Sequence, residues 1–293
     1  MSELVRARFS VLGAALLFST GGAAIKGTTL TGIEVAGLRS AVAALALFLV
    51  LPSARRGIRA DLLPAALAYA ATLVCFVTST KWTTAAAAIF LQSTAPLWVL
   101  LLSPWLLREP IRRRDLPFLG TIAVGLLLVF LGSRDPAATA PRPLAGNAIA
   151  LGAGLAYALM MIGMRRLSLA EPGRDRSLPA TVLGNVLAFA LCAPFFSAPV
   201  ERATGADLAA ILYLGVVQIG VAYWLFVRGL RHLSALEVSL LVLLEPVLNP
   251  LWTWWLHDER PSLLALVGGG VLLVAIGVRT LLDRPASART ARA

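Results

Sequence analysis

One carboxyl group lies deep inside an apolar run in the C-terminal part of the chain. Glu245 stands between Leu244 and Pro246, and Asn249 and Trp252 follow it at spacings of four and three residues. These spacings put the three polar side chains on one face of a helix. In apolar surroundings a carboxyl group either stays protonated and hydrogen-bonds a neighbouring helix, or it binds a substrate group or exchanges a proton. Both interpretations of Glu245 remain open from sequence alone.

Two prolines occupy matching places in two apolar runs. Pro96 and Pro246 each lie near the middle of a run that is predicted as helical, where proline removes a hydrogen bond and frees a carbonyl group. In lipid that carbonyl needs a partner or a water-lined cavity, so the pair favours a binding site over simple kinks. We expect a substrate cavity lined by Ser19, Ser79, Gln92, Pro96, Tyr157, Met161, Gln218, Tyr223, Glu245, Pro246 and Asn249.

Motifs for other kinds of chemistry are missing from the sequence. It contains no phosphate-binding loop of the form G-x-x-x-x-G-K-[ST] and no H-E-x-x-H zinc motif. Its two cysteines, Cys75 and Cys192, lie inside apolar runs as small hydrophobic residues. No nucleophile, base and orienting acid cluster together along the chain. We therefore expect no catalytic residue, no metal and no cofactor, and an enzyme is the weaker hypothesis.

The composition excludes an ordinary soluble domain. Of the 293 residues, 58% are hydrophobic and 14% are charged, whereas soluble domains carry about 25% charged residues. The mean hydropathy is +0.82. A net charge of +11 can indicate nucleic-acid binding, but here the arginines form short clusters between apolar runs rather than one basic face. We expect a lipid bilayer around the chain, and no nucleic acid.

The chain divides into apolar runs separated by short loops rich in glycine and proline. A helix needs about 20 apolar residues to cross a bilayer. The first run follows Arg6 and Arg8 as a signal peptide would, but its length and the lack of a clear cleavage site favour a transmembrane helix. The sequence predicts ten such helices, at about 9–27, 32–51, 61–81, 84–107, 115–132, 143–164, 178–196, 206–228, 235–256 and 262–282.

The basic residues predict the orientation of these helices. With the N-terminus in the cytoplasm, 19 of the 26 Lys and Arg residues fall in inside segments and 6 in outside segments. This bias follows the positive-inside rule and places both termini in the cytoplasm. The remaining basic residue, Arg39, lies in the second run with Glu34. We expect these two residues to form a structural ion pair or a gate.

The chain also contains an internal repeat. Residues 81–109 align without a gap to residues 231–259, which matches Pro96 with Pro246 and ends each copy on a glutamate. The glycine-rich fifth and tenth helices follow the two copies, and they are expected to pack closely as scaffold.

The repeat predicts the architecture. Each copy spans five helices, and an odd number means that the second copy crosses the membrane upside down. We predict an all-α membrane protein whose ten transmembrane helices form two five-helix inverted-topology repeats around a central cavity. The first repeat covers residues 1–140 and the second covers residues 141–293.

The second copy resembles a known family. The stretch Ser234–Glu237, followed by Leu244-Glu245-Pro246, resembles the S-A-x-x-A…L-x-P/E-P pattern of the EamA type of the drug/metabolite transporter superfamily. Glu259 resembles the loop glutamate of that family, and residues 269–278 resemble its G-x-x-L-I-x-x-G-V ending. Within the superfamily, the chain is most similar to the YddG-type exporters of aromatic and related neutral amino acids. In the first copy, Ala95 replaces the glutamate before the proline.

The resemblance implies a secondary transporter of the bacterial inner membrane. It would export small neutral or zwitterionic metabolites, in particular aromatic amino acids, by alternating access. Gln92, Gln218, Glu245 and Asn249 would hold polar groups, with Tyr157 and Tyr223 against the side chain. Efflux of drugs or other metabolites is the alternative within this class, and a membrane-embedded enzyme or assembly subunit is the alternative outside it. The expected partners are an amino acid-like substrate and the bilayer, in a monomer or homodimer.

Overall fold

The described part of the chain is built of helices. The computed structural model describes residues 3–106, 116–133, 135, 137–170, 176–197, 199–230, 241–242 and 244–282. Within these residues there is no β-strand, and the one extended pairing is an isolated bridge between Ala137 and Ala140. The predicted all-α class is therefore confirmed for the part of the chain that is described.

The N-terminal half consists of helices joined by short connections. In chain order they are α1 (Glu3–Ser19), α2 (Gly21–Lys26), α3 (Gly32–Val50), the 3-10 turns η1 (Pro52–Arg55) and η2 (Ala60–Leu62), α4 (Leu63–Trp82), α5 (Ala85–Gln92), α6 (Ala95–Leu106) and α7 (Leu116–Gly132). The Glu109 of the predicted repeat lies outside the described residues.

The C-terminal half continues in the same way. Its elements are α8 (Pro143–Ala170), α9 (Ser177–Cys192), the 3-10 turn η4 (Ala193–Phe195), α10 (Pro199–Arg202), α11 (Gly205–Leu212), the π-helical stretch η5 (Tyr213–Val221), α12 (Ala222–Leu230), α14 (Leu244–His257) and α15 (Leu263–Leu282). The motif at Ser234–Glu237 lies outside the described residues.

Six helical stretches in the described residues are long and apolar enough to cross a membrane. They are Glu3–Lys26, Gly32–Val50, Ala60–Trp82, Pro143–Met164, Ser177–Phe195 and Gly205–Phe226. Two shorter apolar helices are Pro117–Gly132 and Leu263–Val278. All eight segments coincide with predicted runs. Large apolar side chains such as Phe9, Leu127 and Trp255 are mostly exposed, as lipid-facing residues must be. The chain is a multi-pass membrane protein.

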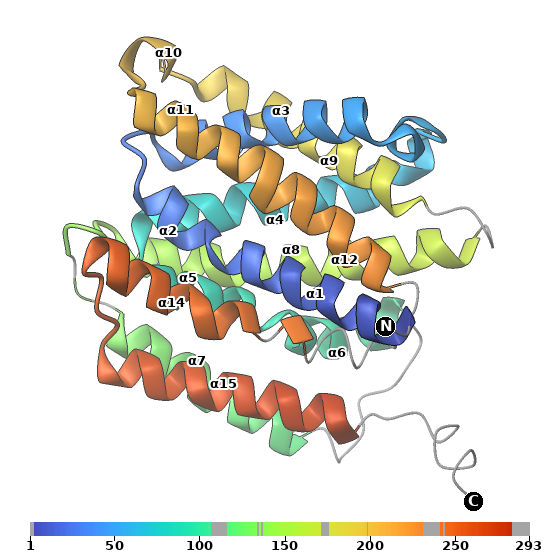
Figure 1. Ribbon diagram of the computed structural model, residues 1–293. Helices are drawn as coiled ribbons and strands as arrows, with labels where there is room; N and C mark the ends of the chain where they lie inside the picture. The colour runs from blue at the N-terminus through green and yellow to red at the C-terminus, as the bar shows by residue number, and fades with distance from the viewer. Residues whose placement is uncertain are drawn as a thin grey trace, which may run out of the picture.

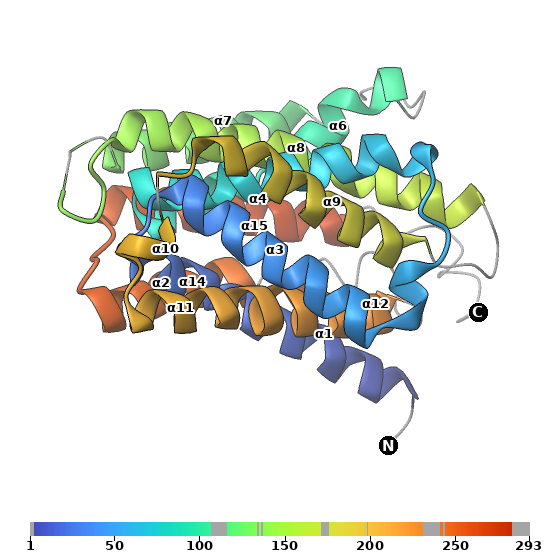
Figure 2. The same ribbon diagram turned by 90° about the horizontal axis from the view of Figure 1, so that it is seen from above.

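The helices lie side by side along one axis. In Figure 1, α1 begins and α15 ends at the right of the view, whereas the α4–α5 junction and the starts of α8 and α11 lie at the left. We call the left end, where α2 finishes, the Lys26 end. Seen from above, α1, α11 and α12 form one edge of the bundle, and α6 and α7 form the opposite edge (Figure 2).

Capping boxes begin two helices at the Lys26 end. The Glu34 carboxylate accepts from the Thr31 backbone N–H at 2.9 Å, and Thr31 Oγ1 accepts from the Glu34 N–H at 3.3 Å. Thr204 and Asp207 form the same motif at the start of α11. Asp207 also accepts a hydrogen bond from the Thr29 N–H at 2.7 Å. The caps satisfy backbone donors that a helix start leaves free, and they fix where both helices begin.

Helices from the two halves of the chain pack against each other. The contacting pairs include α4 with α8, α3 with α9, α4 with α9, α1 with α12, and α7 with α15. Glycine permits the α7–α15 contact, because a Cβ at Gly268 would lie 2.8 Å from the Gly125 carbonyl oxygen. Small residues allow backbones to approach this closely in lipid. The packing expected of the glycine-rich fifth and tenth helices is therefore observed.

Candidate functional site

The first membrane span is interrupted inside the bundle. Ser19 ends α1, Thr20 forms a turn, and α2 begins at Gly21. The hydroxyls of Ser19 and Thr20 donate to carbonyl groups three residues earlier at 2.7 Å, which offers the backbone an alternative to the helix pattern. The two glycines that follow weaken the helix further. The continuous run predicted at 9–27 is thus two helices with a break between them.

Predicted site residues converge on this break. Trp252 Nε1 donates a hydrogen bond to Ser19 Oγ at 2.9 Å. The side-chain amide of Gln218 lies 3.5 Å from the Phe18 carbonyl oxygen and packs against Gly21. A Cβ at Gly21 would lie 2.8 Å from Gln218 Nε2. The break therefore brings polar groups of α14 and η5 together with those of α1.

Asn249 packs against the same break. It is fully buried on α14, and a Cβ on Gly22 would collide with its side-chain amide. Neither its Oδ1 nor its Nδ2 has a hydrogen-bond partner in the described structure. Most buried polar atoms in proteins are paired. An unpaired amide at this position is free to bind a ligand or water.

Tyrosines form a second part of the site, on the side of Gln218 toward α4 and α8. The rings of Tyr69 and Tyr223 have centroids 5.4 Å apart, and Tyr223 packs edge-on to Phe18 at 5.1 Å. Tyr157 packs against the same cluster. Asn185 Nδ2 donates to the Tyr69 hydroxyl at 3.2 Å. Tyr157 and Tyr223 were predicted, whereas Tyr69 and Asn185 were not. Both missed residues are isolated polar side chains in apolar runs, the same signal that singled out Gln218.

Helix α8 exposes side chains on two opposite faces. Met161 is 45% exposed and lies one turn after Tyr157, whereas Leu159 is 39% exposed. Side chains two positions apart on an α-helix differ by about 200° in direction. Leu159 therefore points the other way from Met161. The α8 residues that pack in the tyrosine cluster are Tyr157, Met160 and Met164, so of the predicted pair only Tyr157 is shown to border it.

The predicted proline sites differ from expectation in detail. Helix α5 ends at Gln92, and α6 begins at Ala95, so Pro96 is the second residue of a new helix rather than a kink in one. Proline fits a first turn because its missing N–H would be unpaired there. Among the described residues, the buried Oε1 of Gln92 has no hydrogen-bond partner. Pro246 is the third described residue of α14; Leu241 and Val242 before it are also helical, and residue 243 lies outside the described residues.

Glu245 lies beside Pro246 and is half-buried. Its carboxyl group is within electrostatic range of Tyr157 and Tyr223, so it belongs to the tyrosine side of the site. The proline inside α14 is Pro250, which the sequence argument did not use. Ser79 lies apart from these residues, near the end of α4, and its hydroxyl donates to the Phe76 carbonyl at 2.8 Å.

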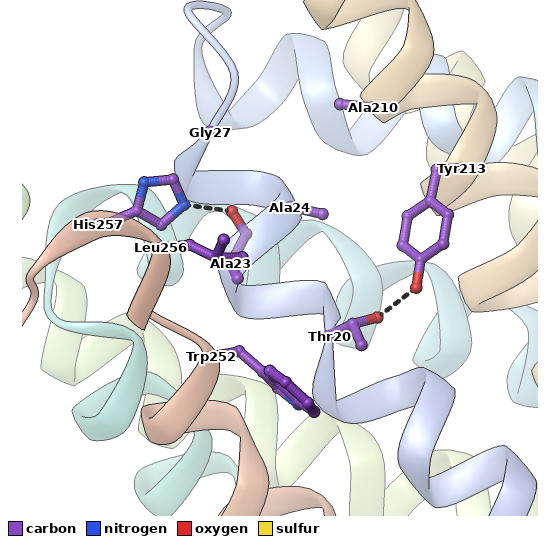
Figure 3. A pocket seen from close by; sticks show the side chains of 9 residues that line it. All are labelled: Thr20, Ala23, Ala24, Gly27, Ala210, Tyr213, Trp252, Leu256 and His257. Atoms are coloured by element: carbon purple, nitrogen blue, oxygen red, sulfur yellow. Dashed lines mark hydrogen bonds between the residues drawn. The ribbon is translucent and has the colours of Figure 1, made fainter. Parts of the chain in front are cut away.

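A cavity of about 450 Å³ opens beside the break (Figure 3). It lies between α2, α11 with η5, and α14. Thr20 and Tyr213 share a hydrogen bond of 2.8 Å on one side of it, and His257 contacts the Ala23 carbonyl at 2.8 Å on another. The lining residues are Thr20, Ala23, Ala24, Gly27, Ala210, Tyr213, Trp252, Leu256 and His257. Trp252 connects the cavity to Ser19 at the break.

A buried ion pair closes the bundle at the Lys26 end. Lys26 Nζ lies 3.0 Å from Glu259 Oε2, and their side chains are only 4% and 2% exposed. Lys26 also donates to the carbonyl groups of Thr83 and Thr139. The second oxygen of Glu259 accepts the Ala85 N–H at 2.5 Å. This network ties α2 and the α14–α15 connection to the start of α5.

The predicted ion pair between Glu34 and Arg39 is wrong, whereas the alternative prediction of a gate stays a prediction. Glu34 Oε1 instead lies 2.5 Å from Arg202 Nη2, and it accepts from Ser197. Arg39 Nη1 donates to Gln218 Oε1 at 3.3 Å. Five residues along a helix correspond to about 140° in direction, so the two side chains leave α3 on different faces. The spacing of five residues in the sequence is therefore enough to exclude this ion pair.

Within the described residues, no group of three or more His, Cys, Asp and Glu side chains could hold a metal ion. The arrangement is instead a set of amide, phenol and hydroxyl groups, with one carboxyl and one guanidinium group, inside an apolar bundle. Such a set can bind a small polar molecule through hydrogen bonds and aromatic contacts.

The comparison with protein families decides which class of protein this is. A model of EamA-like transporters matches the chain twice, over residues 6–131 and 144–281. The chain belongs to the EamA-like transporter family. Members of this family are transporters and not enzymes, so this EamA protein is a membrane transporter of small metabolites.

The fold of this EamA protein recurs in a solved structure. A chain described as "Crystal structure of protein" superimposes on it with a TM-score of 0.63 and 20% sequence identity, over 95% of this chain and 98% of that chain. At this identity the likeness shows the fold alone. No curated protein matches the EamA protein significantly.

Proposed function

We propose that the EamA protein is a secondary transporter that exports small neutral or zwitterionic metabolites, in particular aromatic and related amino acids. It would resemble the YddG-type exporters in this respect. The proposed location is a bacterial inner membrane with both termini in the cytoplasm, which makes the Lys26 end the outer end. The proposed mechanism is alternating access.

The proposed architecture is ten transmembrane helices in two inverted five-helix repeats, residues 1–140 and 141–293. The two matches to one family model support it. The packing supports it as well, because exchange of the two repeats relates the α4–α8 pair to the α1–α12 pair. The same exchange maps the α3–α9 and α7–α15 pairs onto themselves. These pairings are what a two-fold axis between the repeats would produce.

The observation that carries the proposal is the polar and tyrosine cluster inside the bundle. Its members come from both proposed repeats, with Ser19 and Tyr69 from the first, and Gln218, Tyr223 and Asn249 from the second. Polar groups inside a membrane are costly and mark substrate paths. The phenol rings suit a planar side chain, and the amides and the carboxyl group suit the polar groups of an amino acid.

The test is transport by purified protein in liposomes. We expect flux of labelled tryptophan, phenylalanine and threonine above that of empty liposomes. Counterflow, in which unlabelled amino acid inside accelerates uptake, would identify a carrier rather than a leak. No flux of any amino acid contradicts the substrate proposal. Flux of planar cationic dyes in that case would favour drug efflux, and flux of no compound would favour an assembly role.

Proton coupling is tested separately. If Glu245 exchanges a proton during transport, Glu245→Gln abolishes the response of amino acid flux to an imposed pH gradient. Facilitated exchange without protons predicts equal flux for the wild type and for Glu245→Gln, with no response to the gradient.

A further inference from the structure

Arg39 is a buried cation in the membrane interior. It lies on α3, about 10 Å along the helix axis from Gly32, and its side chain is 1% exposed. It is among the largest fully buried side chains of the described structure. An arginine inside a membrane is strongly unfavourable unless it is paired or serves a substrate.

No described carboxylate pairs with Arg39. Glu34, on the same helix, is held by Thr31, Ser197 and Arg202. The hydrogen bond that Arg39 makes is to the neutral amide of Gln218. Its Nε has no partner in the described structure.

The groups that face Arg39 come from three further helices and are neutral at physiological pH. Tyr69 of α4, Cys192 of α9 and Tyr223 of α12 lie within electrostatic range, and phenols and thiols ordinarily ionise above neutral pH. The described residues around Arg39 therefore do not balance its charge. A guanidinium group presents five N–H donors in a fork that matches a carboxylate, and most of that fork is unused.

The position of Arg39 connects it with the rest of the site. Gln218, its hydrogen-bond partner, lies against the break between α1 and α2. Tyr223 is within electrostatic range of both Arg39 and Glu245. The tyrosines thus lie between two charged or ionisable groups, the guanidinium group of Arg39 and the carboxyl group of Glu245. A free amino acid with an aromatic side chain carries the complementary groups: carboxylate, ring and ammonium.

We infer that Arg39 is the anchor for the carboxylate of the transported substrate, an inference that rests on the proposed function. The carboxylate replaces Gln218 as the acceptor for the guanidinium group and takes up the unused Nε–H. The ammonium group of the same substrate is directed toward Glu245. This assigns the substrate class as small carboxylates with an aromatic or apolar body.

Three ligands separate the carboxylate from the other groups of the substrate. They are phenylalanine, phenylalaninamide, which lacks the carboxylate, and 3-phenylpropionate, which lacks the ammonium group. Binding is measured by calorimetry on the purified full-length protein in lipid nanodiscs. The wild type is expected to bind both carboxylates, and to bind phenylalaninamide about 10- to 100-fold more weakly than phenylalanine.

Substitution of Arg39 is expected to remove this preference. Arg39→Gln should weaken binding of phenylalanine and 3-phenylpropionate about 10- to 100-fold and leave phenylalaninamide unchanged. Arg39→Lys keeps a charge but loses the fork, so it should retain a smaller preference for carboxylates. The matched control is Arg176→Gln, because Arg176 is also buried but already has a carboxylate partner, Asp61, at 2.6 Å. It should keep the full preference.

The inference is overturned if the wild type binds neither carboxylate, if it binds the amide as tightly as the acid, or if Arg39→Gln binds all three ligands like the wild type. A thermal unfolding scan shows whether Arg39→Gln folds. If it does not, the decision rests on the wild-type preference and on Arg39→Lys, where an undiminished preference counts against the inference. Binding of 3-phenylpropionate that depends on Arg39 without amino acid flux would sink the proposed function and leave the carboxylate site standing.

Discussion

At the scale of single residues, the candidate site contains buried polar atoms that have no hydrogen-bond partner among the described residues. Arg39, Gln92, Asn185 and Asn249 each have at least one such atom. A buried unsatisfied group costs about 1–3 kcal/mol. In a transporter this loss of stability is offset on substrate binding, because the substrate supplies hydrogen-bond partners for the same atoms.

Asn249 allows this idea to be tested against a matched residue. Asn147 is also fully buried, but it accepts a hydrogen bond from Thr83 at 2.7 Å. Asn249→Ala should leave thermal stability nearly unchanged and raise the KM for amino acid flux about five- to tenfold, through loss of one hydrogen bond to substrate. Asn147→Ala should lower stability by about 1–3 kcal/mol and leave KM unchanged.

Thermal unfolding in detergent and concentration-dependent flux in liposomes measure the two effects. A loss of stability in Asn249→Ala equal to that in Asn147→Ala, with an unaltered KM, would show that Asn249 has only a structural role.

Sequence reasoning located part of this residue set. Ser19, Gln218 and Asn249 stood out because a polar side chain in an apolar run is costly, and the structure brings these three to one place. The hydrogen bond between Thr20 and Tyr213 could not be predicted, because it joins residues far apart in the chain that only the folded bundle brings together. The pairing of Glu34 with Arg202 could not be predicted for the same reason.

At the scale of elements, interrupted helices define the site. The breaks between α1 and α2 and between α5 and α6 fall inside runs that hydropathy reads as continuous. Hydropathy measures the apolar content of a segment, whereas a break depends on which hydroxyl competes for a carbonyl group and on where glycine or proline follows. Run positions could therefore be predicted from the sequence, but the breaks could not.

Close helix packing gives the prediction that belongs to this scale. A Cβ at Gly268 would lie 2.8 Å from backbone atoms of α7, whereas a Cβ at Gly270 meets nothing within 4 Å. Gly268→Ala should destabilise the protein by about 1–3 kcal/mol through overpacking. Gly270→Ala should be neutral or slightly stabilising, because alanine favours helix. Unfolding temperatures of the two variants, side by side, measure the difference, and equal temperatures would contradict the α7–α15 contact.

At the scale of the whole molecule, the bundle is closed at the Lys26 end by a network around one ion pair. Lys26 and Glu259 come from the two proposed repeats and are almost fully buried. Loss of one partner of a buried ion pair costs about 3–5 kcal/mol. A transporter moves between two states, and loss of one partner destabilises only the state in which the two residues are in contact.

Glu259→Gln should therefore favour opening at the Lys26 end. The reporter is Ser79→Cys, a buried position near that end, in a chain without Cys75 and Cys192. Its labelling by a membrane-impermeant maleimide should be several-fold faster with Glu259→Gln. The control is Asp258→Asn, because Asp258 pairs with Arg260 on the surface, where the side chains are 76% and 72% exposed, and such pairs contribute little. Equal rates in both variants would contradict a gate.

The pairing of helices across the two halves has a consequence for how the molecule can be assembled. Each half offers its partner several long faces, α4 to α8, α1 to α12 and α7 to α15, and helices that have already inserted into a bilayer associate through such faces. Residues 1–140 and 141–293, synthesised as two separate chains, should then associate in the membrane into a working transporter. The peptide link between the halves would raise their local concentration without being needed for their recognition.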